Sequence, residues 1–347
     1  MFETPISFEE FYNRQILLKE LGREGQEKLS HSKVAVVGLG GLGSVASLYL
    51  ALAGVGYLRL IDQDIVEPKN LHRQILYTLK DVKYPKAEVA AKKLSEFNPL
   101  IQVEAIPENL NGDNAEELLS GVDCVVDGLD NMATRYIVNR TCVKFRIPYV
   151  FGAAIGLEGN LSVFAHPETP CLECIMPNIN DAALPTCDIR GVLNTTPGII
   201  GIMEALEAIK VLAGIGAPLK GKLMICDFGD MYITTIDVAK SPNCPACQHE
   251  KPERGNFRHK LVWLCGRNTV NINPEKPINL NLDNLRQKIE RNFKIQLKSQ
   301  AAVVFTYKNY EVTIFRNGRM LIKDISSVEE ALRIHQEISQ KLGIKLY

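Results

Sequence analysis

The feature that most constrains the fold is a glycine-rich turn between a buried strand and a helix. The apolar run KVAVVG begins at Lys33, residues 38–43 read GLGGLG, and the helical segment SVASLYLALAGV leads to a second apolar run, YLRLI. Two buried strands joined through a helix predict a βαβ unit. Glycines in such a turn let a phosphate or ribose approach the backbone, where the helix N-terminus favours an anion. The candidate ligand-binding glycines are Gly38, Gly40, Gly41 and Gly43.

The alternation of helices and strands continues after this unit. We expect helices over residues 85–97, near 113–120 and over 131–145, followed in turn by the strands IQVEAI, DCVVDG and PYVFGA. This pattern predicts an α/β fold, Rossmann-like and doubly wound, with a mainly parallel sheet that binds its ligand at the C-terminal ends of the strands. The later runs LSVFAHP, KLMICDF and YITTIDV are separated by short turns and predict an antiparallel extension of the sheet.

The chain of 347 residues is long enough for a second, smaller unit. The segment SPNCPACQHEKPERGN is the best linker candidate, so we expect one domain over residues 1–250 and another over 255–347. After the linker, the strand LVWLCG, a helix over 282–291, the strand AVVFTY, a hairpin turned at Asn317 and Gly318, and a helix over 328–342 predict a small α+β domain.

Charge is distributed unequally between these two parts, although the formal net charge is zero. Residues 251–347 contain 18 Lys and Arg against 9 Asp and Glu, whereas the first 250 residues contain 22 against 31. The split suggests that the basic unit docks an acidic protein partner, such as a downstream acceptor. A merely solvated basic surface is the alternative. Nucleic acid binding is not expected because aromatic stacking platforms are few.

Composition also restricts the cellular setting. Hydrophobic residues make up 46% of the chain and charged residues 23%, and no window of eighteen apolar residues is free of charge, so no membrane span is expected. The N-terminus MFETPISFEEFYNRQ lacks the basic start and apolar run of a secretory signal. We therefore expect a cytoplasmic protein.

Nine cysteines in such a chain need an explanation other than disulfides. Four of them form two C-x-x-C pairs, which are the ligand set of a closed structural zinc site. Two redox dithiols are the alternative, but neither pair opens a helix in a thioredoxin-like unit. Cys124 and Cys142 fall inside apolar patterns and are expected in the core, and Cys226 and Cys265 receive no role. The candidate zinc ligands are Cys171, Cys174, Cys244 and Cys247.

The segment after the second strand decides between classes of nucleotide enzyme. Asp62 closes that strand, where a carboxylate can bind ribose, and a nicotinamide dehydrogenase remains possible at this point. Residues 62–74, DQDIVEPKNLHRQ, then resemble the D-x-D…N-x-x-R-Q signature of the ThiF/MoeB/HesA family of ubiquitin-activating-enzyme-like adenylyltransferases. The resemblance extends over about residues 8–250 through RQ at 14–15, PKA at 85–87, DGLDN at 127–131, both C-x-x-C pairs and TC at 186–187.

This resemblance implies an enzyme that uses ATP and Mg²⁺ to adenylate the C-terminal carboxylate of a ubiquitin-like or sulfur-carrier β-grasp protein. It implies that Arg73 and Lys86 contact the phosphates, that Asp130 holds Mg²⁺ and that Asp62 holds the ribose. Such charges are needed because the reaction brings anions together. The remaining residues expected at the nucleotide by their place in the family motifs are Asp64, Asn70, Gln74 and Asn131.

Two further residues gain roles from the resemblance. Arg14 matches an arginine that reaches into the ATP site of the neighbouring subunit, which implies a homodimer. Cys187 matches a cysteine that in many relatives takes the acyl group as a thioester or joins sulfur transfer. The rhodanese that some relatives carry at the C-terminus has no counterpart pattern here.

Two other classes stay open from the residues alone. A nicotinamide oxidoreductase would explain the glycine turn and Asp62, but not Arg73, Lys86 or the cysteine pairs. A non-catalytic scaffold that binds ubiquitin-like proteins through the basic unit would leave Arg73, Lys86 and Asp130 without a purpose.

Overall fold

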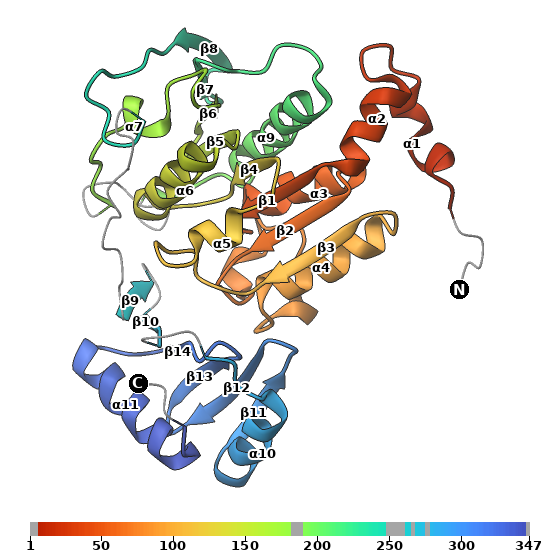
Figure 1. The fold of residues 1–347 in the computed structure, drawn as a ribbon. Helices are drawn as coiled ribbons and strands as arrows, with labels where there is room; N and C mark the ends of the chain where they lie inside the picture. Colours follow the sequence, from red (N-terminus) through yellow and green to blue (C-terminus); the bar gives the residue numbers. More distant parts are fainter. Residues whose placement is uncertain (1–5, 182–189, 248–260, 265–267, 275–277, 345–347) are drawn as a thin grey trace.

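The computed structural model describes residues 6–181, 190–247, 261–264, 268–274 and 278–344. These residues form two units, each with its own sheet and its own apolar core (Figure 1). No helix in this part of the chain is long and apolar enough to cross a membrane.

The larger unit is built on an eight-stranded sheet in the order β3-β2-β1-β4-β5-β6-β7-β8. Strands β1 to β5 are parallel, and β5 to β8 pair antiparallel, which confirms the expected extension. The strands are β1 (Lys33–Val37), β2 (Tyr57–Ile61), β3 (Gln102–Ile106), β4 (Cys124–Asp127), β5 (Tyr149–Ile155), β6 (Glu158–Phe164), β7 (Lys222–Asp227) and β8 (Tyr232–Asp237).

Helices cover both faces of this sheet, as its continuous apolar strands require. In β1, Val34 and Val36 pack into one core cluster, and Ala35 and Val37 into the other. Helices α3, α4 and α9 contribute to the first cluster, and α5 and α6 to the second. The helices of this unit are α1 (Phe8–Ile16), α2 (Gly22–His31), α3 (Gly43–Ala53), α4 (Lys86–Phe97), α5 (Ala115–Leu119), α6 (Met132–Phe145), α7 (Leu172–Ile175) and α9 (Thr195–Ala213), with 3-10 turns η1 (Pro68–Asn70) and η2 (Leu79–Asp81).

The smaller unit contains a six-stranded antiparallel sheet in the order β11-β12-β13-β14-β10-β9. The helices α10 and α11 bury Ile289 and Ile338 against Phe305 of the sheet. The sequence predicted both helices and the hairpin turned at Asn317 and Gly318, which is formed by β13 and β14, but not the short strands β10 and β11. The elements are β9 (Leu261–Leu264), β10 (Thr269–Ile272), α10 (Leu282–Asn292), β11 (Lys294–Lys298), β12 (Ala302–Tyr307), β13 (Tyr310–Phe315), β14 (Met320–Ile322) and α11 (Val328–Leu342).

The smaller unit lies against the larger one beyond the C-terminal end of β2 (Figure 1). Ile65, four residues after β2, is buried in an apolar cluster with Ala302, Phe315 and Leu321 of the smaller unit. The C-terminal ends of the parallel strands therefore face a second protein surface.

Candidate active site

The glycine-rich turn joins β1 to α3, and its glycines fall into two groups. A Cβ on Gly43 would lie 1.9 Å from the carbonyl oxygen of Gly38, and one on Gly38 would lie 2.5 Å from that of Gly128, after β4. Gly38 also has a φ of 87°, which favours glycine. A Cβ on Gly40 would meet only atoms at 3.9 Å. Gly38 and Gly43 thus serve close backbone packing, whereas Gly40 leaves room for a ligand.

Asp62 follows β2 and ties the turn to the next segment. Its Oδ2 accepts a hydrogen bond of 2.7 Å from Leu39 N, and its Oδ1 accepts one of 2.7 Å from Asp64 N. Burial raises the pKa of Asp62, while the ammonium of Lys86 acts in the opposite direction. The carboxylate lies at the carboxyl edge of the sheet, where a nucleotide-binding α/β fold holds its ligand.

Lys86 is the first residue of α4 and is almost completely buried, at 3% exposure. Its Nζ lies 3.1 Å from Asp64 Oδ2, and its backbone N donates to Asp64 O. Tyr77, which sequence reasoning missed, is buried beside it and donates from its hydroxyl to Leu39 O at 3.1 Å. A buried ammonium at a helix N-terminus presents two sources of positive potential to an anion.

The segment after Ile65 contributes three more of the expected residues. Arg73 donates from Nη2 to Asn70 Oδ1 at 3.2 Å, and both Asn70 and Gln74 are at most 3% exposed. Asn70 Nδ2 and Gln74 Oε1 have no hydrogen-bond partner among the described residues. Buried polar atoms are rarely left unsatisfied, and each such atom requires an explanation. A bound polar ligand such as a nucleotide supplies one.

The motif DGLDN divides into a buried and an exposed part. Asp127 ends β4 and is fully buried; it forms an ion pair of 2.9 Å with Arg135 and accepts a hydrogen bond of 2.5 Å from the hydroxyl of Tyr149. Asp130 is exposed. Asn131 caps α6 through a 2.9 Å bond from Thr134 N. Asp130 is therefore the carboxylate of this motif that a dissolved metal ion can reach.

Asp127 and Arg135 form a support that sequence reasoning did not assign. Arg135 also donates to Leu129 O at 2.8 Å and to Gly152 O at 2.7 Å, so it joins the loop after β4 to strand β5. Burial raises the pKa of Asp127, with the guanidinium of Arg135 acting against it. The one signal in the sequence was a carboxylate as the last residue of a buried strand.

Cys187 lies outside the described residues, but both flanks of its segment are described. Before it, Asp181 accepts hydrogen bonds of 2.6 Å from Met132 N and 3.0 Å from Ala133 N, at the N-terminus of α6. After it, Arg190 forms an ion pair of 2.6 Å with Glu158 in β6. The helix α6 starts two residues after Asp130, and Asp181 accepts its hydrogen bonds from the first two residues of that helix. The described residues before Cys187 therefore end close to Asp130.

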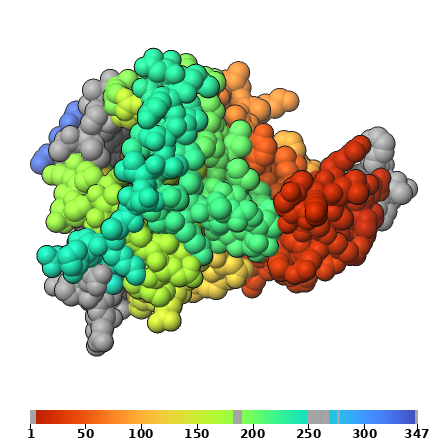
Figure 2. All heavy atoms as spheres, turned by 90° about the horizontal axis from the view of Figure 1, so that it is seen from above, coloured from red at the N-terminus to blue at the C-terminus, as the bar shows by residue number. Residues whose placement is uncertain are grey.

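Arg14 is exposed in α1 and is not brought to the other expected residues of its own chain. Tyr12 of the same helix packs at the C-terminal ends of α3 and α4, opposite to the ends that carry the glycine turn and Lys86. It accepts a 2.7 Å hydrogen bond from Asn98, just after α4, and touches Gly54, just after α3. Lys86 begins α4, whose 12 residues span about 18 Å. The helices α1 and α2 project from the body of the molecule (Figure 2).

The two cysteine pairs meet in space, 73 residues apart in the chain. Cys171 Sγ lies 3.5 Å from Cys244 Sγ, and Cys174 Sγ lies 3.4 Å from Cys247 Sγ, with all four sulfurs within 4.8 Å of one another. Thiolates at about 2.3 Å from a tetrahedral zinc are separated by about 3.8 Å, so the four fit such an ion.

The surroundings of this cluster are closed by hydrogen bonds. Asn139 of α6 donates to Cys171 Sγ at 3.6 Å and to Glu173 at 3.1 Å, and accepts from Leu172 N at 3.0 Å. Arg140 pairs with Glu173 at 2.8 Å. This polar shell fixes the first cysteine pair against α6, as expected of a structural metal site. Away from the cluster, Cys124, Cys142 and Cys226 are buried core residues.

Comparison with known sequences identifies proteins that are related to this chain. The ThiF family profile matches residues 12–246. The sulfur carrier protein adenylyltransferase of Thermus thermophilus is 44% identical over 249 residues, covering 70% of this chain and 92% of the relative. The SAMP-activating enzyme E1 of Haloferax volcanii is 41% identical over 68% of this chain and 87% of the relative. The chain spans about half, 51%, of the maize adenylyltransferase and sulfurtransferase MOCS3-1, at 44% identity over 68% of this chain.

Comparison with solved structures gives the same grouping. Escherichia coli MccB aligns with a TM-score of 0.63 at 25% identity, over 73% of this chain and 76% of MccB. The crystal structure of E. coli MccB with ATP aligns with a TM-score of 0.59 at 26% identity, over 65% of this chain and 68% of that chain. The fold, the ordered motifs and the sequence matches together show that the chain belongs to the ThiF family.

Proposed function

We propose that this protein is an ATP-dependent adenylyltransferase that activates the C-terminal carboxylate of a sulfur-carrier or ubiquitin-like β-grasp protein. The observation that carries the proposal is the carboxyl edge of the parallel sheet. There Asp62, Lys86 and Gln74 are buried beside a turn that leaves space at Gly40, and buried amide atoms lack partners within the described chain. Relatives named as a sulfur carrier adenylyltransferase and a SAMP-activating E1 support this substrate class.

The proposed reaction joins two anions. The carrier's carboxylate oxygen attacks the α-phosphorus of ATP, the new P–O bond forms as the bond to pyrophosphate breaks, and an acyl adenylate results. Arg73 and Lys86 would hold phosphate oxygens, the first by a forked guanidinium and the second as a point charge. Asp62 would accept from a ribose hydroxyl, and Asn70 and Gln74 would orient oxygens. Asp130 would share a Mg²⁺ ion with the phosphates, which neutralises charge as pyrophosphate departs.

The four-cysteine cluster would hold one Zn²⁺ per chain. The donor set is all thiolate and closed, so the metal would stabilise the fold and leave no position for substrate. The ligand Cys171 caps α7 and Cys174 lies within it, and the pair formed by Cys244 and Cys247 lies after β8. Zinc would thus join two distant segments of the larger unit.

A homodimer with shared sites is the assembly that fits Arg14. This side chain is exposed on α1, which projects with α2 from the body of the molecule (Figure 2). Tyr12 attaches α1 to Asn98 at the C-terminal end of α4, whereas Lys86 begins that helix. A second copy related by a closed two-fold axis could receive Arg14. Exposed apolar side chains in and beside β8, including Met231 at 75% and Tyr232 at 62% exposure, offer a further surface for protein contact. An acidic acceptor docked on the basic unit stays a prediction.

Cys187 would act after adenylation. Its thiolate would attack the carbonyl carbon of the acyl adenylate, forming a C–S bond while the bond to the AMP oxygen breaks, and AMP would leave with that electron pair. Cys187→Ser should retain pyrophosphate exchange but lose a thiol-sensitive adduct with the carrier, seen on non-reducing gels. An adduct that survives in Cys187→Ser would assign this step to another cysteine, with Cys265 the first to test.

The experiment that tests the main proposal is carrier-dependent ATP–pyrophosphate exchange. Purified protein is incubated with ATP, Mg²⁺, labelled pyrophosphate and each candidate β-grasp carrier in turn. Label should enter ATP only with a carrier whose C-terminal carboxylate is free. A carrier with an amidated C-terminus is the matched control, and exchange that does not depend on the carboxylate would contradict the proposal.

A further inference from the structure

The segment that follows β2 presents alternate side chains to two different parts of the molecule. Asp62 bonds to the glycine turn, and Asp64 pairs with Lys86 at 3.1 Å. Between and beyond them, Gln63 bonds to the smaller unit and Ile65 packs into an apolar cluster with side chains of that unit. In an extended segment, neighbouring side chains point to opposite sides. One short stretch of chain therefore carries the nucleotide carboxylates on one side and the interface to the smaller unit on the other.

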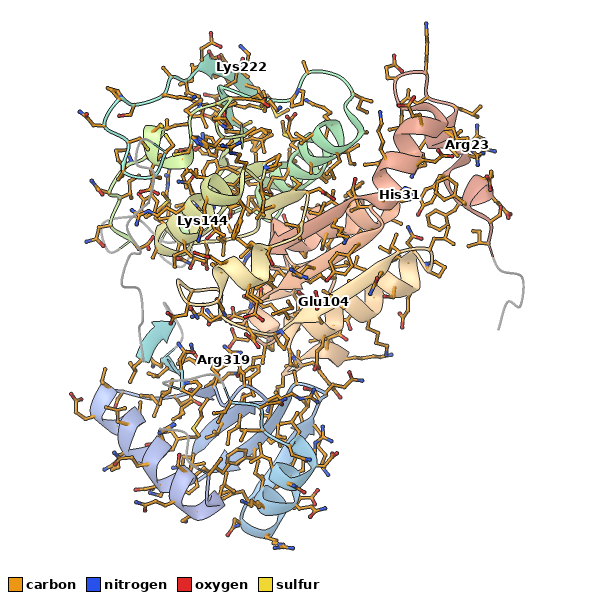
Figure 3. The ribbon with its side chains drawn as sticks, viewed as in Figure 1. Arg23, His31, Glu104, Lys144, Lys222 and Arg319 are labelled. Carbon is orange, nitrogen blue, oxygen red and sulfur yellow. The ribbon has the colours of Figure 1, made fainter. Side chains whose placement is uncertain are left out.

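The contact to Gln63 is made by an arginine that is 1% exposed. Arg319 lies in the turn between β13 and β14, at the junction of the two units (Figure 3). Its Nη2 donates to Gln63 O, and its Nη1 lies 3.5 Å from Gln63 Oε1. The guanidinium stacks 3.6 Å above the ring centroid of Phe315. Asn271 of β10 also approaches Gln63 Oε1, at 3.5 Å.

A buried guanidinium is a costly way to join two surfaces. Removing a charge from water carries a large desolvation penalty, which a hydrophobic contact would not require. Burial lowers the pKa of Arg319 to about 10, and the charges of Asp64, Asp62 and Glu108 oppose that decrease. Two of these three carboxylates are the residues assigned above to the nucleotide. The charge of Arg319 is thus compensated mainly by the site that it adjoins.

We propose that Arg319 is a positioning residue for the nucleotide site, so that the smaller unit forms part of the adenylation machinery. This inference rests on the proposed function. Arg319 holds the peptide carbonyl between Asp62 and Asp64, and its charge favours the ionised form of both carboxylates beside the polyanionic ATP. The family profile ends at residue 246, before the unit that supplies this arginine.

Other contacts hold the smaller unit in the place that this role requires. Lys323 pairs with Glu311 at 2.8 Å and lies 3.6 Å from Glu67 of the larger unit, and Lys83 of the larger unit pairs with Glu311 at 2.5 Å. These charged contacts join the two units in addition to the apolar contact of Ile65. Loss of Arg319 alone therefore leaves an interface in place, and its effect can be measured in the full chain.

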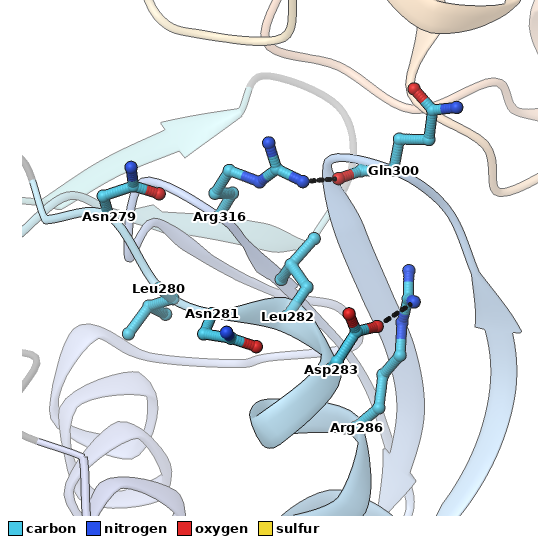
Figure 4. Close-up of a pocket in the computed structure, with 8 residues that line it drawn as sticks. All are labelled: Asn279, Leu280, Asn281, Leu282, Asp283, Arg286, Gln300 and Arg316. Atoms are coloured by element: carbon cyan, nitrogen blue, oxygen red, sulfur yellow. Dashed lines mark hydrogen bonds and ion pairs between the residues drawn. The ribbon is translucent and has the colours of Figure 1, made fainter.

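The test is calorimetric titration of ATP with Mg²⁺ into the full-length protein and three variants. Arg319→Gln removes the charge and should weaken ATP binding at least about tenfold, the scale of one buried charge-assisted contact. Arg316→Gln is the matched control: Arg316 lies three residues away and donates to Gln300 O at 2.8 Å within a pocket of the smaller unit (Figure 4). Its ATP affinity should stay within about twofold of the wild type.

Arg319→Lys gives a readout that a purely structural contact would not change. A lysine has an ordinary pKa of about 10.4, and the same burial lowers it, so its charge is lost as the pH rises. As the pH rises from about 7 to about 9, the ATP affinity of Arg319→Lys should therefore fall more steeply than that of the wild type, because an arginine has a higher ordinary pKa than a lysine. The groups facing this position are Asp62, Asp64 and Glu108.

The inference is overturned if folded Arg319→Gln binds ATP as tightly as the wild type, or if Arg319→Lys has the pH profile of the wild type. ATP binding needs no carrier, so the two proposals can fail separately. Wild-type protein that binds ATP but never exchanges pyrophosphate would end the adenylation proposal and still let the variants decide on Arg319. Wild-type protein that binds no ATP would overturn both.

Discussion

The cysteine cluster and the carboxyl edge of the parallel sheet, where the nucleotide is proposed to bind (the nucleotide end), are both polar and buried. They differ in how completely their hydrogen bonds are satisfied. Around the cysteines, Asn139 uses its oxygen and nitrogen, and Glu173 is paired with Arg140. At the nucleotide end, Asn70 Nδ2 and Gln74 Oε1 have no partner among the described residues. A closed network fixes one geometry, whereas unsatisfied buried atoms are costly unless something else binds them.

This difference separates the two regions by purpose. The cysteine region would stabilise the fold with a resident metal, and the nucleotide end would accept and release a ligand in every turnover. Substitutions in the first should mainly change stability, and those in the second should mainly change activity. Each prediction below tests that division.

The largest effect should follow from Lys86→Met. Loss of one preorganised cation at the phosphates should reduce carrier-dependent pyrophosphate exchange at least about a hundredfold. Circular dichroism should show a folded protein. The matched control is Lys93→Met on the same helix, because Lys93 pairs with Asp81 away from the glycine turn; its exchange should stay within about twofold. Near-normal pyrophosphate exchange in Lys86→Met would contradict the placement of the nucleotide site at this end of the sheet.

The reverse pattern should follow from Cys174→Ala. Elemental analysis should find about one zinc per wild-type chain and none in the variant, with a thermal midpoint lower by many degrees. Exchange measured per folded molecule at low temperature should remain near that of the wild type. Cys226→Ala, in the core away from the cluster, should keep its zinc. A wild-type protein that folds fully without zinc would contradict the structural role.

The sequence predicted the parts of the site that follow strands, because a buried strand followed by glycine or a carboxylate is a local pattern. Asp62 after β2 and Asp130 after β4 are of this kind. Asp181 and Arg319 were not predicted, because their partners lie 49 and 256 residues away in the chain. Contacts over such separations depend on how whole elements pack, and a single sequence carries no local mark of them.

The same reason explains the misses in the smaller unit. Strand β10 has only four residues, too few for an alternation to stand out from the surrounding loops. By contrast, α11 was predicted at its observed bounds, since Ser327 caps it and Gly343 ends it. Long periodic elements with end signals are readable, and short strands are defined by their neighbours.

A smaller but more specific effect tests whether the nucleotide end is shared between two chains. Arg14→Ala and Lys86→Ala should each be inactive alone in pyrophosphate exchange. After subunit exchange, half of the dimers would be mixed and each would contain one intact site, so activity should recover to about a quarter of the wild type. If subunit exchange is verified but activity does not recover, Arg14 is a surface residue of its own chain and does not act in the partner's site.

The smallest effect concerns Glu204, a third place where buried polar atoms lack partners. Glu204 in α9 is fully buried against Gly152 of β5, and neither carboxylate oxygen has a partner among the described residues. Burial raises its pKa well above the ordinary 4.5, with the nearby charge of Asp127 adding to the shift. We expect Glu204 to be a protonated core acid and not a nucleotide ligand.

This expectation fixes the sign of a pH effect on stability. In the unfolded chain Glu204 ionises near its ordinary pKa, whereas in the folded protein it keeps its proton, so folding takes up a proton between the two pKa values. The contribution of Glu204 to stability is therefore full below about pH 4 and falls as the pH rises, by up to about 1.4 kcal/mol per pH unit.

Glu204→Gln is neutral at every pH and removes this loss. Urea unfolding should show the variant gaining on the wild type as the pH rises from about 5 to about 7, above the ordinary pKa of a glutamate. Glu207→Gln removes the charge that pairs with Lys210 and leaves one side-chain oxygen where Leu219 N and Lys210 now use two, so this variant should be less stable than the wild type at both values. If the difference in unfolding free energy between Glu204→Gln and the wild type does not change with pH, Glu204 is ionised in the folded protein. The region of unsatisfied polar atoms at the nucleotide end would then extend to α9.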